Sequence, residues 1–190
     1  MIRDVSENDI ANIIELHLKS FSKKHFSAVF SKDLLQKYFI KLIAINKFCF
    51  VYYDNKEEEL LGYIIAGFNT GKAVSQFTQE NKYTIMFTLL KKPRFLLEKV
   101  GALYNQLIKK NVINTQCRLF LIAVNENHKG EGIGRKLINY FESQLRKDEI
   151  KDYGLSVRKE NSNAIRFYNN GGYIIDSEDS KSISYKKEVL

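Results

Sequence analysis

Cysteine, proline and histidine are scarce in this chain of 190 residues, which contains two, one and three of them. Cys49 and Cys117 each lie in a short apolar run typical of a buried strand, so we expect two buried free thiols and no disulfide framework. No apolar run is long enough to cross a bilayer, which argues against a membrane span. No internal repeat or low-complexity linker divides the sequence.

The first nine residues, MIRDVSEND, lack the apolar stretch of a secretory signal and carry acids instead. We therefore expect a cytoplasmic protein. With 44% hydrophobic and 27% charged residues, the composition is that of a chain that folds on its own. Its length suffices for one domain with a substantial core, so we expect residues 1–190 to form a single domain.

Acidic residues are outnumbered by basic ones, which gives a formal charge of +8. Such a charge attracts anionic partners at long range: nucleic acid, an acidic membrane surface, a phosphorylated cofactor or an anionic substrate. The lysines are scattered along the chain and are equally consistent with a solvated basic surface. Because no nucleic-acid reader motif is present, we expect no nucleic-acid partner.

The apolar periodicity of the first 68 residues predicts a strand, two helices and a hairpin. Ser6 and Asp9 have the spacing of a helix N-terminal capping box, with Asp in place of the usual Glu. Apolar residues at helical spacing follow it, and strand-like runs come later. The predicted elements are a strand at 2–5, helices at 10–21 and 33–45 joined by a loop, and hairpin strands at 48–53 and 60–68.

In residues 69–114 a polar stretch is followed by apolar runs at 84–90 and 95–108, on either side of Pro93. Proline is tolerated in a first helical turn but not inside a helix, so two helices broken at Pro93 are predicted. Beyond them, RLFLIAV at 118–124 has the continuous apolar character of a central strand. The remaining predicted elements are a helix at 132–147, a strand at 153–157, a helix at 162–169 and strands at 173–176 and 182–186.

This order of elements indicates an α/β fold, with a mixed central β-sheet flanked by helices on both faces. A ligand of such a sheet binds where strands and their following helices diverge. Glycines 130, 132 and 134 lie at one such place, between a buried strand and an amphipathic helix. They allow the backbone to approach a ligand, and the unpaired N–H groups of the helix start favour an anion such as a pyrophosphate.

The glycine spacing matches neither of the commoner phosphate loops. The Rossmann motif would need a glycine where this chain has Arg135 or Leu137. The Walker motif would need a glycine in place of Arg135, followed by lysine and a hydroxyl residue. A turn that only lets a helix pack on a sheet is the alternative interpretation.

The segment AVNENHKGEGIGRKL instead resembles the cofactor motif of the GCN5-related N-acetyltransferase (GNAT) superfamily. That motif is Gln or Arg, two residues, Gly, one residue, then Gly or Ala; Lys129 replaces the Gln or Arg, and Gly132 and Gly134 follow. The stretch VRKENSNAIRFYNNGGYII resembles the closing motif of the same superfamily. Its matching residues are Asn161, Ala164, Phe167, Tyr168, Gly172 and Tyr173.

The resemblance implies the GNAT fold, acetyl-CoA as co-substrate and no metal. In the family, backbone groups equivalent to those of Ile122 and Val124 pair with the pantetheine arm, and the Ile122 N–H polarises the thioester carbonyl. The tyrosine equivalent to Tyr168 protonates the leaving thiolate. The expected cofactor-binding residues are Ile122, Ala123, Val124, Lys129, Gly130, Glu131, Gly132, Ile133, Gly134, Arg135, Asn161, Ala164 and Tyr168.

The general base is not evident from the sequence. Some relatives carry a glutamate where this chain has Arg118, which cannot accept a proton. His25 lies in the loop that borders the acceptor site in the family, so it is a candidate base or substrate contact, against the alternative of an exposed loop residue. We expect His17 to be structural and His128 to lie beside the cofactor; a water chain is an equally good base.

The expected reaction is transfer of an acetyl group to an amine of a small molecule, such as an amino sugar or a nucleotide-linked amino sugar. Alternatives are a protein N-acetyltransferase, a longer acyl chain, or a CoA-binding regulatory module without turnover. Residues 69–114 are expected to form a helical insertion before the central strand. With Lys91, Lys92 and Arg94 beside apolar runs, it would form a wall of the acceptor site that favours an anionic substrate, form a homodimer interface or contact a membrane surface.

Overall fold

A computed structural model describes residues 1–21, 27, 30–54, 56, 59–90 and 115–189. These residues contain a seven-stranded sheet in the order β1-β2-β3-β4-β5-β7-β6. Neighbouring strands are antiparallel except for β4 and β5, which are parallel. The predicted mixed α/β sheet is therefore confirmed, and β4 is a central strand, as its apolar sequence indicated.

Each predicted element that falls within the described residues is present, with ends shifted by no more than one or two positions. The elements are β1 (Ile2–Asp4), α1 (Ile10–Ser20), α2 (Lys32–Ile45), β2 (Phe48–Tyr53), β3 (Leu60–Gly67), α3 (Thr70–Glu80), α4 (Lys82–Leu90), β4 (Arg118–Val124), α6 (Ile133–Lys147), β5 (Asp152–Arg158), α7 (Ser162–Asn169), β6 (Ile174–Glu178) and β7 (Ser182–Glu188). Short 3-10 turns, η1 (Glu7–Asp9) and η3 (Glu126–His128), precede α1 and follow β4.

The segment between β3 and β4 differs in part from the prediction. Helix α4 contains the predicted apolar run, but α3 was not predicted, because the segment before residue 84 is largely polar. Its buried residues Thr70, Ala73 and Phe77 recur at helical spacing. Phe77 packs against Tyr38 of α2, with ring centroids 5.1 Å apart. The second predicted helix, with Lys91, Lys92 and Arg94, lies outside the described residues.

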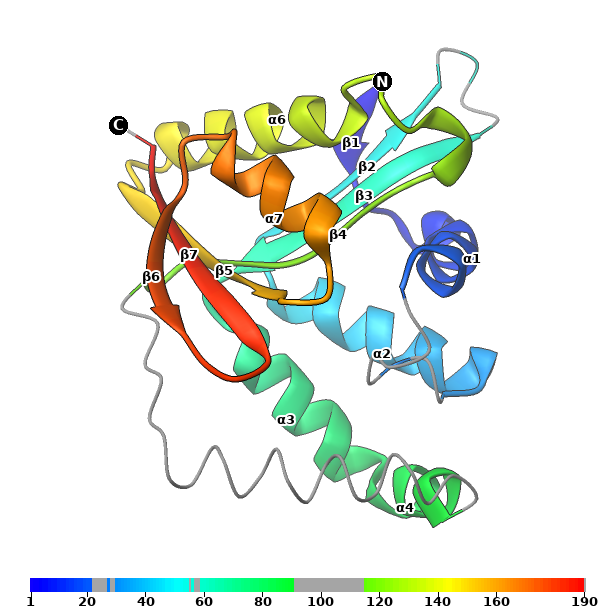
Figure 1. The fold of residues 1–190 in the computed structure, drawn as a ribbon. Helices are drawn as coiled ribbons and strands as arrows, with labels where there is room; N and C mark the ends of the chain where they lie inside the picture. Colours follow the sequence, from blue (N-terminus) through cyan, green and yellow to red (C-terminus); the bar gives the residue numbers. More distant parts are fainter. Residues whose placement is uncertain (22–26, 28–29, 55, 57–58, 91–114, 190) are drawn as a thin grey trace.

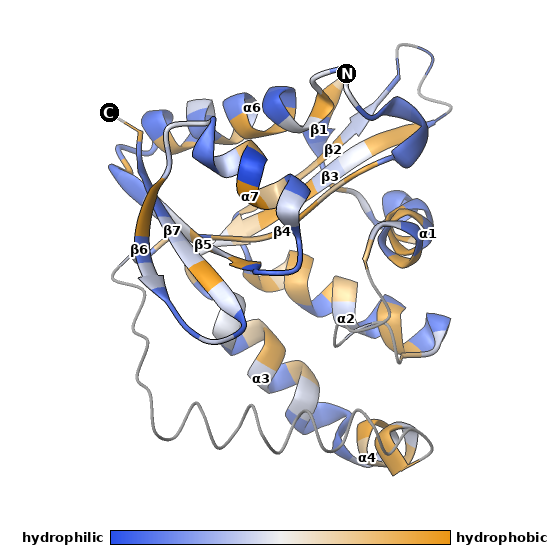
Figure 2. Ribbon diagram, in the orientation of Figure 1, coloured by the Kyte–Doolittle hydropathy of each residue, from blue (hydrophilic) through white to orange (hydrophobic). Residues whose placement is uncertain are grey.

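Helices cover both faces of the sheet, as Figure 1 shows. Helices α1, α2 and α3 pack on one face, where a core cluster joins residues such as Ile13 and Leu35 to Tyr63 of β3. Helices α6 and α7 cover the other face, where Phe141 and Tyr168 join a second cluster. The outer side of α6 is polar and its apolar side faces the sheet (Figure 2). No helix among the described residues is long and apolar enough to span a membrane.

The predicted capping box at the start of α1 is built around a buried carboxylate. Asp9 accepts hydrogen bonds from the Ser6 backbone N–H and the Ser6 hydroxyl, both at 2.7 Å. It also pairs with the Arg3 guanidinium through two bonds of 2.7 and 2.9 Å. Burial alone would raise the pKa of Asp9, but the bonds from Arg3 and Ser6 outweigh it and hold the pKa well below its usual range.

Replacing Asp9 by Asn should lower the free energy of unfolding by about 2 kcal/mol at pH 7, because charge-assisted bonds to Arg3 and Ser6 are lost. The pKa of Asp9 is lower in the folded protein than in the unfolded chain, where it is about 3.9. The stabilisation is therefore complete at pH values above about 3.9, and it is lost progressively as the pH falls from there towards the folded-state pKa. Urea unfolding between pH 7 and pH 3 measures this. Asp33→Asn, in the first turn of α2, should change stability by about 0.5 kcal/mol or less. If the difference in unfolding free energy between wild type and Asp9→Asn does not decrease at acidic pH, the ionised Asp9 carboxylate is not the source of the stabilisation.

The start of α6 is held close to the sheet by a glycine in β3. A Cβ built on Gly62 would lie 2.7 Å from the carbonyl oxygen of Ala123 and 2.9 Å from Cδ1 of Leu137. The first of these atoms belongs to the backbone of β4 and cannot move aside cheaply. Glycine at 62 therefore sets the distance between β3, β4 and α6.

Gly62→Ala should lower the free energy of unfolding by about 1–3 kcal/mol through overpacking. Gly71→Ala is the matched control, since its added Cβ meets nothing within 4 Å in α3. That change should leave stability unaltered or raise it by up to about 1 kcal/mol. Equal chemical-denaturation midpoints for the two variants would show that the protein can accommodate a side chain at position 62 without loss of stability.

Candidate active site

The sheet opens between β4 and β5. In the described part of the chain these strands share one register pair, Arg118 with Gly154. There the Gly154 N–H donates to the Cys117 carbonyl oxygen at 3.0 Å. Beyond this pair the strands separate, and a cavity of about 860 Å³ lies at the opening. Its lining residues are Ser20, Phe21, Arg118, Leu119, Phe120, Leu121, Ile122, Leu155, Ser156, Val157, Arg158, Glu160, Asn161, Ala164, Tyr168 and Ser182.

A β-bulge in β4 determines which backbone groups face this opening. Leu121 pairs with Ile65 and Leu119 with Ala66, so Phe120 has no residue opposite it in β3. Past the bulge, the Asn125 N–H donates to the Leu61 carbonyl at 2.8 Å.

In an antiparallel ladder, hydrogen-bonded pairs alternate with pairs that are not bonded to each other. Because Asn125 bonds to β3, Ala123 does so as well, and the backbone groups of Ile122 and Val124 point away from β3. These are the two residues whose backbone the family resemblance assigns to the pantetheine arm. The structure leaves their N–H and C=O groups directed towards the opening.

The glycine turn follows at the carboxyl end of β4. Gly130 and Gly132 have φ values of +92° and +76°, and Gly132 is the N-cap of α6. A Cβ built on either would meet nothing within 4 Å. The N–H groups of Ile133, Gly134 and Arg135 lie in the first helical turn, where no intrahelical acceptor exists. The turn thus presents several donors, at the positive end of the helix dipole, to an open space that suits an anion.

Side chains around the turn carry both signs of charge. Lys129 pairs with Glu126 at 2.9 Å, which offsets its charge. His128 lies between Glu131 and Glu59, and hydrogen bonds to these two carboxylates raise its pKa. Among the described residues Arg135 forms no ion pair. It is therefore the cation of this turn best placed to receive a phosphate.

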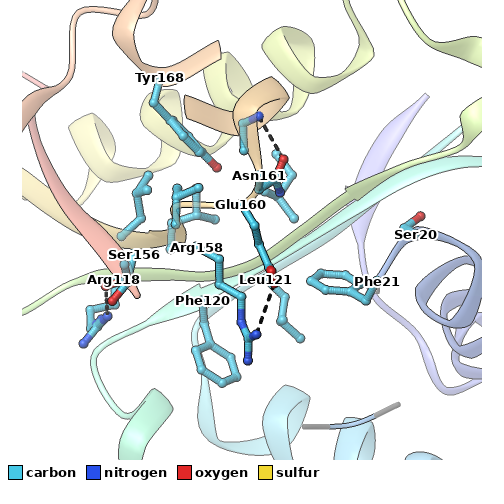
Figure 3. A pocket seen from close by; sticks show the side chains of 16 residues that line it. Ser20, Phe21, Arg118, Phe120, Leu121, Ser156, Arg158, Glu160, Asn161 and Tyr168 are labelled. Carbon is cyan, nitrogen blue, oxygen red and sulfur yellow. Dashed lines mark hydrogen bonds and ion pairs between the residues drawn. The ribbon is translucent and has the colours of Figure 1, made fainter. Parts of the chain in front are cut away.

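Tyr168 projects from α7 into the cavity, as Figure 3 shows. Only 5% of the residue is exposed. Its ring contacts Tyr173 edge-on at 4.9 Å and Tyr185 at 5.8 Å between centroids. Burial raises the pKa of Tyr168, so the hydroxyl remains protonated at neutral pH. The hydroxyl is a fixed proton donor at the opening.

Asn161 lines the same cavity and also caps α7. Its Oδ1 accepts a hydrogen bond from the Ala164 N–H at 3.1 Å, which leaves the Nδ2 group available to a ligand. Ala164 lines the cavity from the first turn of the helix. The start of α7, the helix that carries Tyr168 near its other end, is therefore anchored by a residue of the predicted closing motif.

The cavity reaches through to the opposite face of the sheet. Leu155 and Val157 pack in the core beneath α6 and α7, so the alternating side chains of Ser156 and Arg158 point to the other face. In Figure 3 Tyr168 lies on one side of the cavity, and Phe120 and Arg158 lie on the other. Two ligands can thus approach one point from opposite sides.

Other reactive side chains are used structurally. His17 is buried and its ring nitrogens bond to the hydroxyls of Tyr63, at 2.7 Å, and Ser27, which fits the predicted structural role. Cys49 and Cys117 are buried free thiols, as predicted, and burial raises the pKa of each to about 12. Neither is a thiolate nucleophile at neutral pH. His25 lies outside the described residues.

The structure divides the predicted site residues into two groups. Ile122, Asn161, Ala164 and Tyr168 line the cavity. Ala123, Val124 and the turn from 129 to 135 lie further along, towards and beyond the carboxyl end of β4. Further lining comes from residues that were not predicted as site residues: Phe21, Phe120, Ser156, Arg158, Glu160 and Ser182. None of them is a matching residue of either motif, although Arg158 and Glu160 lie within the stretch that contains the closing motif.

Comparisons with known proteins agree with this geometry. The chain resembles the solved structures of Ard1 from Thermoplasma volcanium (18% identity, TM-score 0.59, 100% of this chain and 97% of that chain) and PaiA N-acetyltransferase from Thermoplasma acidophilum in complex with coenzyme A (15% identity, TM-score 0.63, 99% and 98%). It also resembles the ribosomal-protein-S18-alanine N-acetyltransferase from Escherichia coli (14% identity, TM-score 0.56, 100% and 93%). No curated protein matches the chain.

These distant structures show the fold alone, and a family model assigns the family. The model described as the Acetyltransferase (GNAT) family matches residues 10–173, which include β4, the glycine turn and α7. This protein belongs to the GNAT family of acetyltransferases, enzymes that use acetyl-CoA.

Proposed function

We propose that this enzyme transfers the acetyl group of acetyl-CoA to the amine of a small molecule at the opening between β4 and β5. The observation that carries the proposal is the cavity that crosses the sheet, with the Tyr168 hydroxyl directed into it. A cofactor arm entering from the α6 and α7 side would present its thioester to an amine entering from the other face. The sheet would then hold both reactants in line.

The cofactor half is built from backbone groups. The first-turn amides of α6 and the side chain of Arg135 would bind the pyrophosphate. The pantetheine arm would pair with Ile122 and Val124, whose backbone groups face the opening. Asn161 would contact the arm through its free amide group, and Ala164 leaves room for it.

The chemistry needs one bond to form and one to break. The amine nitrogen attacks the thioester carbonyl carbon, and the Ile122 N–H stabilises the resulting oxyanion. Collapse of this intermediate breaks the carbon–sulfur bond, and Tyr168 donates its proton to the departing thiolate. The amine loses its own proton to water, since Arg118 occupies the position where relatives carry a basic glutamate. A proton from water then returns to the Tyr168 phenolate, which restores the enzyme for the next cycle.

The whole cavity, about 860 Å³, lies within the range of roughly 300–1,000 Å³ typical of small-molecule sites. The pantetheine arm would occupy part of this space, so the remainder suits a small acceptor. An amino sugar or a nucleotide-linked amino sugar is the class of acceptor that we propose. A protein amine is the competing acceptor, because one of the similar solved structures is named ribosomal-protein-S18-alanine N-acetyltransferase. Thiol release measured with amino sugars and with N-terminal peptides distinguishes the two classes.

Gly134→Val should weaken acetyl-CoA binding by about tenfold or more, because the added branches crowd the first-turn amides. Gly71→Val is a matched control, since both glycines are the second residue of a helix. A Cβ at 134 would lie 3.7 Å from Phe167 and Val124, so the fold should tolerate it. Titration calorimetry with acetyl-CoA tests both variants. Wild-type affinity in Gly134→Val would overturn the assignment of the turn.

Tyr168→Phe should lower kcat by about 10²- to 10⁴-fold and leave the acetyl-CoA Kd unchanged, because it removes only the proton donor. Tyr185→Phe is the control: it also loses a buried tyrosine hydroxyl, which bonds to Asn169 at 2.9 Å outside the cavity lining. Its kcat should stay near wild type. The measurement is single-turnover thiol release with an accepted amine. Equal rates for Tyr168→Phe and wild type would assign Tyr168 a packing role.

A further inference from the structure

A partly buried arginine, Arg118, lines the cavity and forms no ion pair with any acidic residue in the described part of the chain. Nη2 of Arg118 donates to the Ser156 hydroxyl at 3.1 Å. Its Nε is buried and, within the described part of the chain, has no hydrogen-bond acceptor. Burial is what lowers the pKa of this guanidinium, and no carboxylate among the described residues acts to raise it.

Such an arrangement is costly for the empty protein. Withdrawing a charge from water is unfavourable unless a partner of opposite charge or several hydrogen bonds replace the solvent. Arginine stays protonated even with a lowered pKa, so the positive charge persists at any accessible pH. One serine hydroxyl offsets little of the cost, whereas a bound anion would offset most of it.

The side chain lies on the acceptor side of the sheet. It bonds to Ser156, which points away from the face covered by α6 and α7. The phosphates of the cofactor are not the natural partner, because the glycine turn begins beyond the other end of β4. Val124 lies six positions along the strand from Arg118, a distance of about 20 Å.

The surroundings fit a carboxylate or phosphate attached to a carbon skeleton. Arg158 and Glu160 pair with each other at 3.3 Å and so largely cancel at the cavity wall. The hydroxyl of Ser184 lies 3.2 Å from that of Ser156, and either of the two can be the donor. Phe120 offers an apolar wall. A guanidinium binds carboxylate and phosphate through two parallel hydrogen bonds.

From this geometry we infer that Arg118 binds an anionic group of the acceptor, so that the preferred substrate is an amine carrying a carboxylate or a phosphate. The inference rests on the proposed function, in which this face of the cavity receives the acceptor. It makes Arg118 a specificity-determining residue and not a base.

The test compares amines that differ only in the anionic group. The probes are the standard amino acids against their C-terminal amides, and glucosamine 6-phosphate against glucosamine. Their binding to the CoA-saturated protein is measured by calorimetry, which requires no turnover. At least one anionic probe should bind wild type about tenfold more tightly than its neutral counterpart, a difference that one charge-assisted contact provides. The better-bound pair identifies the anion as carboxylate or phosphate.

Two variants separate recognition from stability. Arg118→Gln should reduce the preference to about one, while Arg118→Lys keeps part of it, since lysine retains the charge but not the two-bond geometry. Neither should alter the acetyl-CoA Kd. Arg118→Gln should not lower the melting temperature, because it removes an uncompensated buried charge.

Three results would overturn the inference: no anionic probe bound by wild type, equal affinity within every pair, or a preference that survives in Arg118→Gln. Failure of the proposed function would give a different result. In that case acetyl-CoA itself would not bind, or no amine tested would release thiol, in wild type and in the Arg118 variants alike.

Discussion

The separation of β4 from β5 after the pair of Arg118 and Gly154 is the constraint on which the site depends. A continuous parallel ladder would bond every backbone group between these strands and leave no space in the sheet. Here the outward-facing groups of Ile122 and Val124 lose that partner. Buried backbone groups without partners are unfavourable, so the opening itself favours a ligand that can act as the missing strand.

The bulge at Phe120 and the opening act together. Before the bulge, the Cys117 carbonyl bonds to Gly154, so an odd-numbered residue faces β5. After it, the even-numbered Ile122 and Val124 face that direction. One extra residue thus exchanges the residues whose backbone groups face β3 with those whose backbone groups face β5. The side chains change faces of the sheet too. Leu119 belongs to the core on the α6 side, and Leu121 to the core on the side of α1 and α2.

The opening is kept rigid by a network behind α7. The Tyr153 hydroxyl donates to Glu142 of α6 at 2.8 Å and is bonded to the hydroxyl of Tyr173, while Lys187 of β7 pairs with Glu142 at 2.7 Å. Tyr173 in turn packs against Tyr168. Buried polar groups that are fully bonded rigidify their surroundings. The network therefore holds the ring that packs against Tyr168.

Local signals in the sequence determined the strands and most helices, the glycine turn and the two motifs that identify the family. Each depends on residues close together in the chain: the continuous apolar run of β4, the capping pair Ser6 and Asp9, and the glycines between β4 and α6. Tertiary structure decided the rest. Helix α3 has too few apolar residues to be recognised until α2 covers Phe77, and the bulge becomes visible only when β3 sets the register. Whether Arg118 has a counter-ion likewise depends on residues distant in sequence that meet where two strands part.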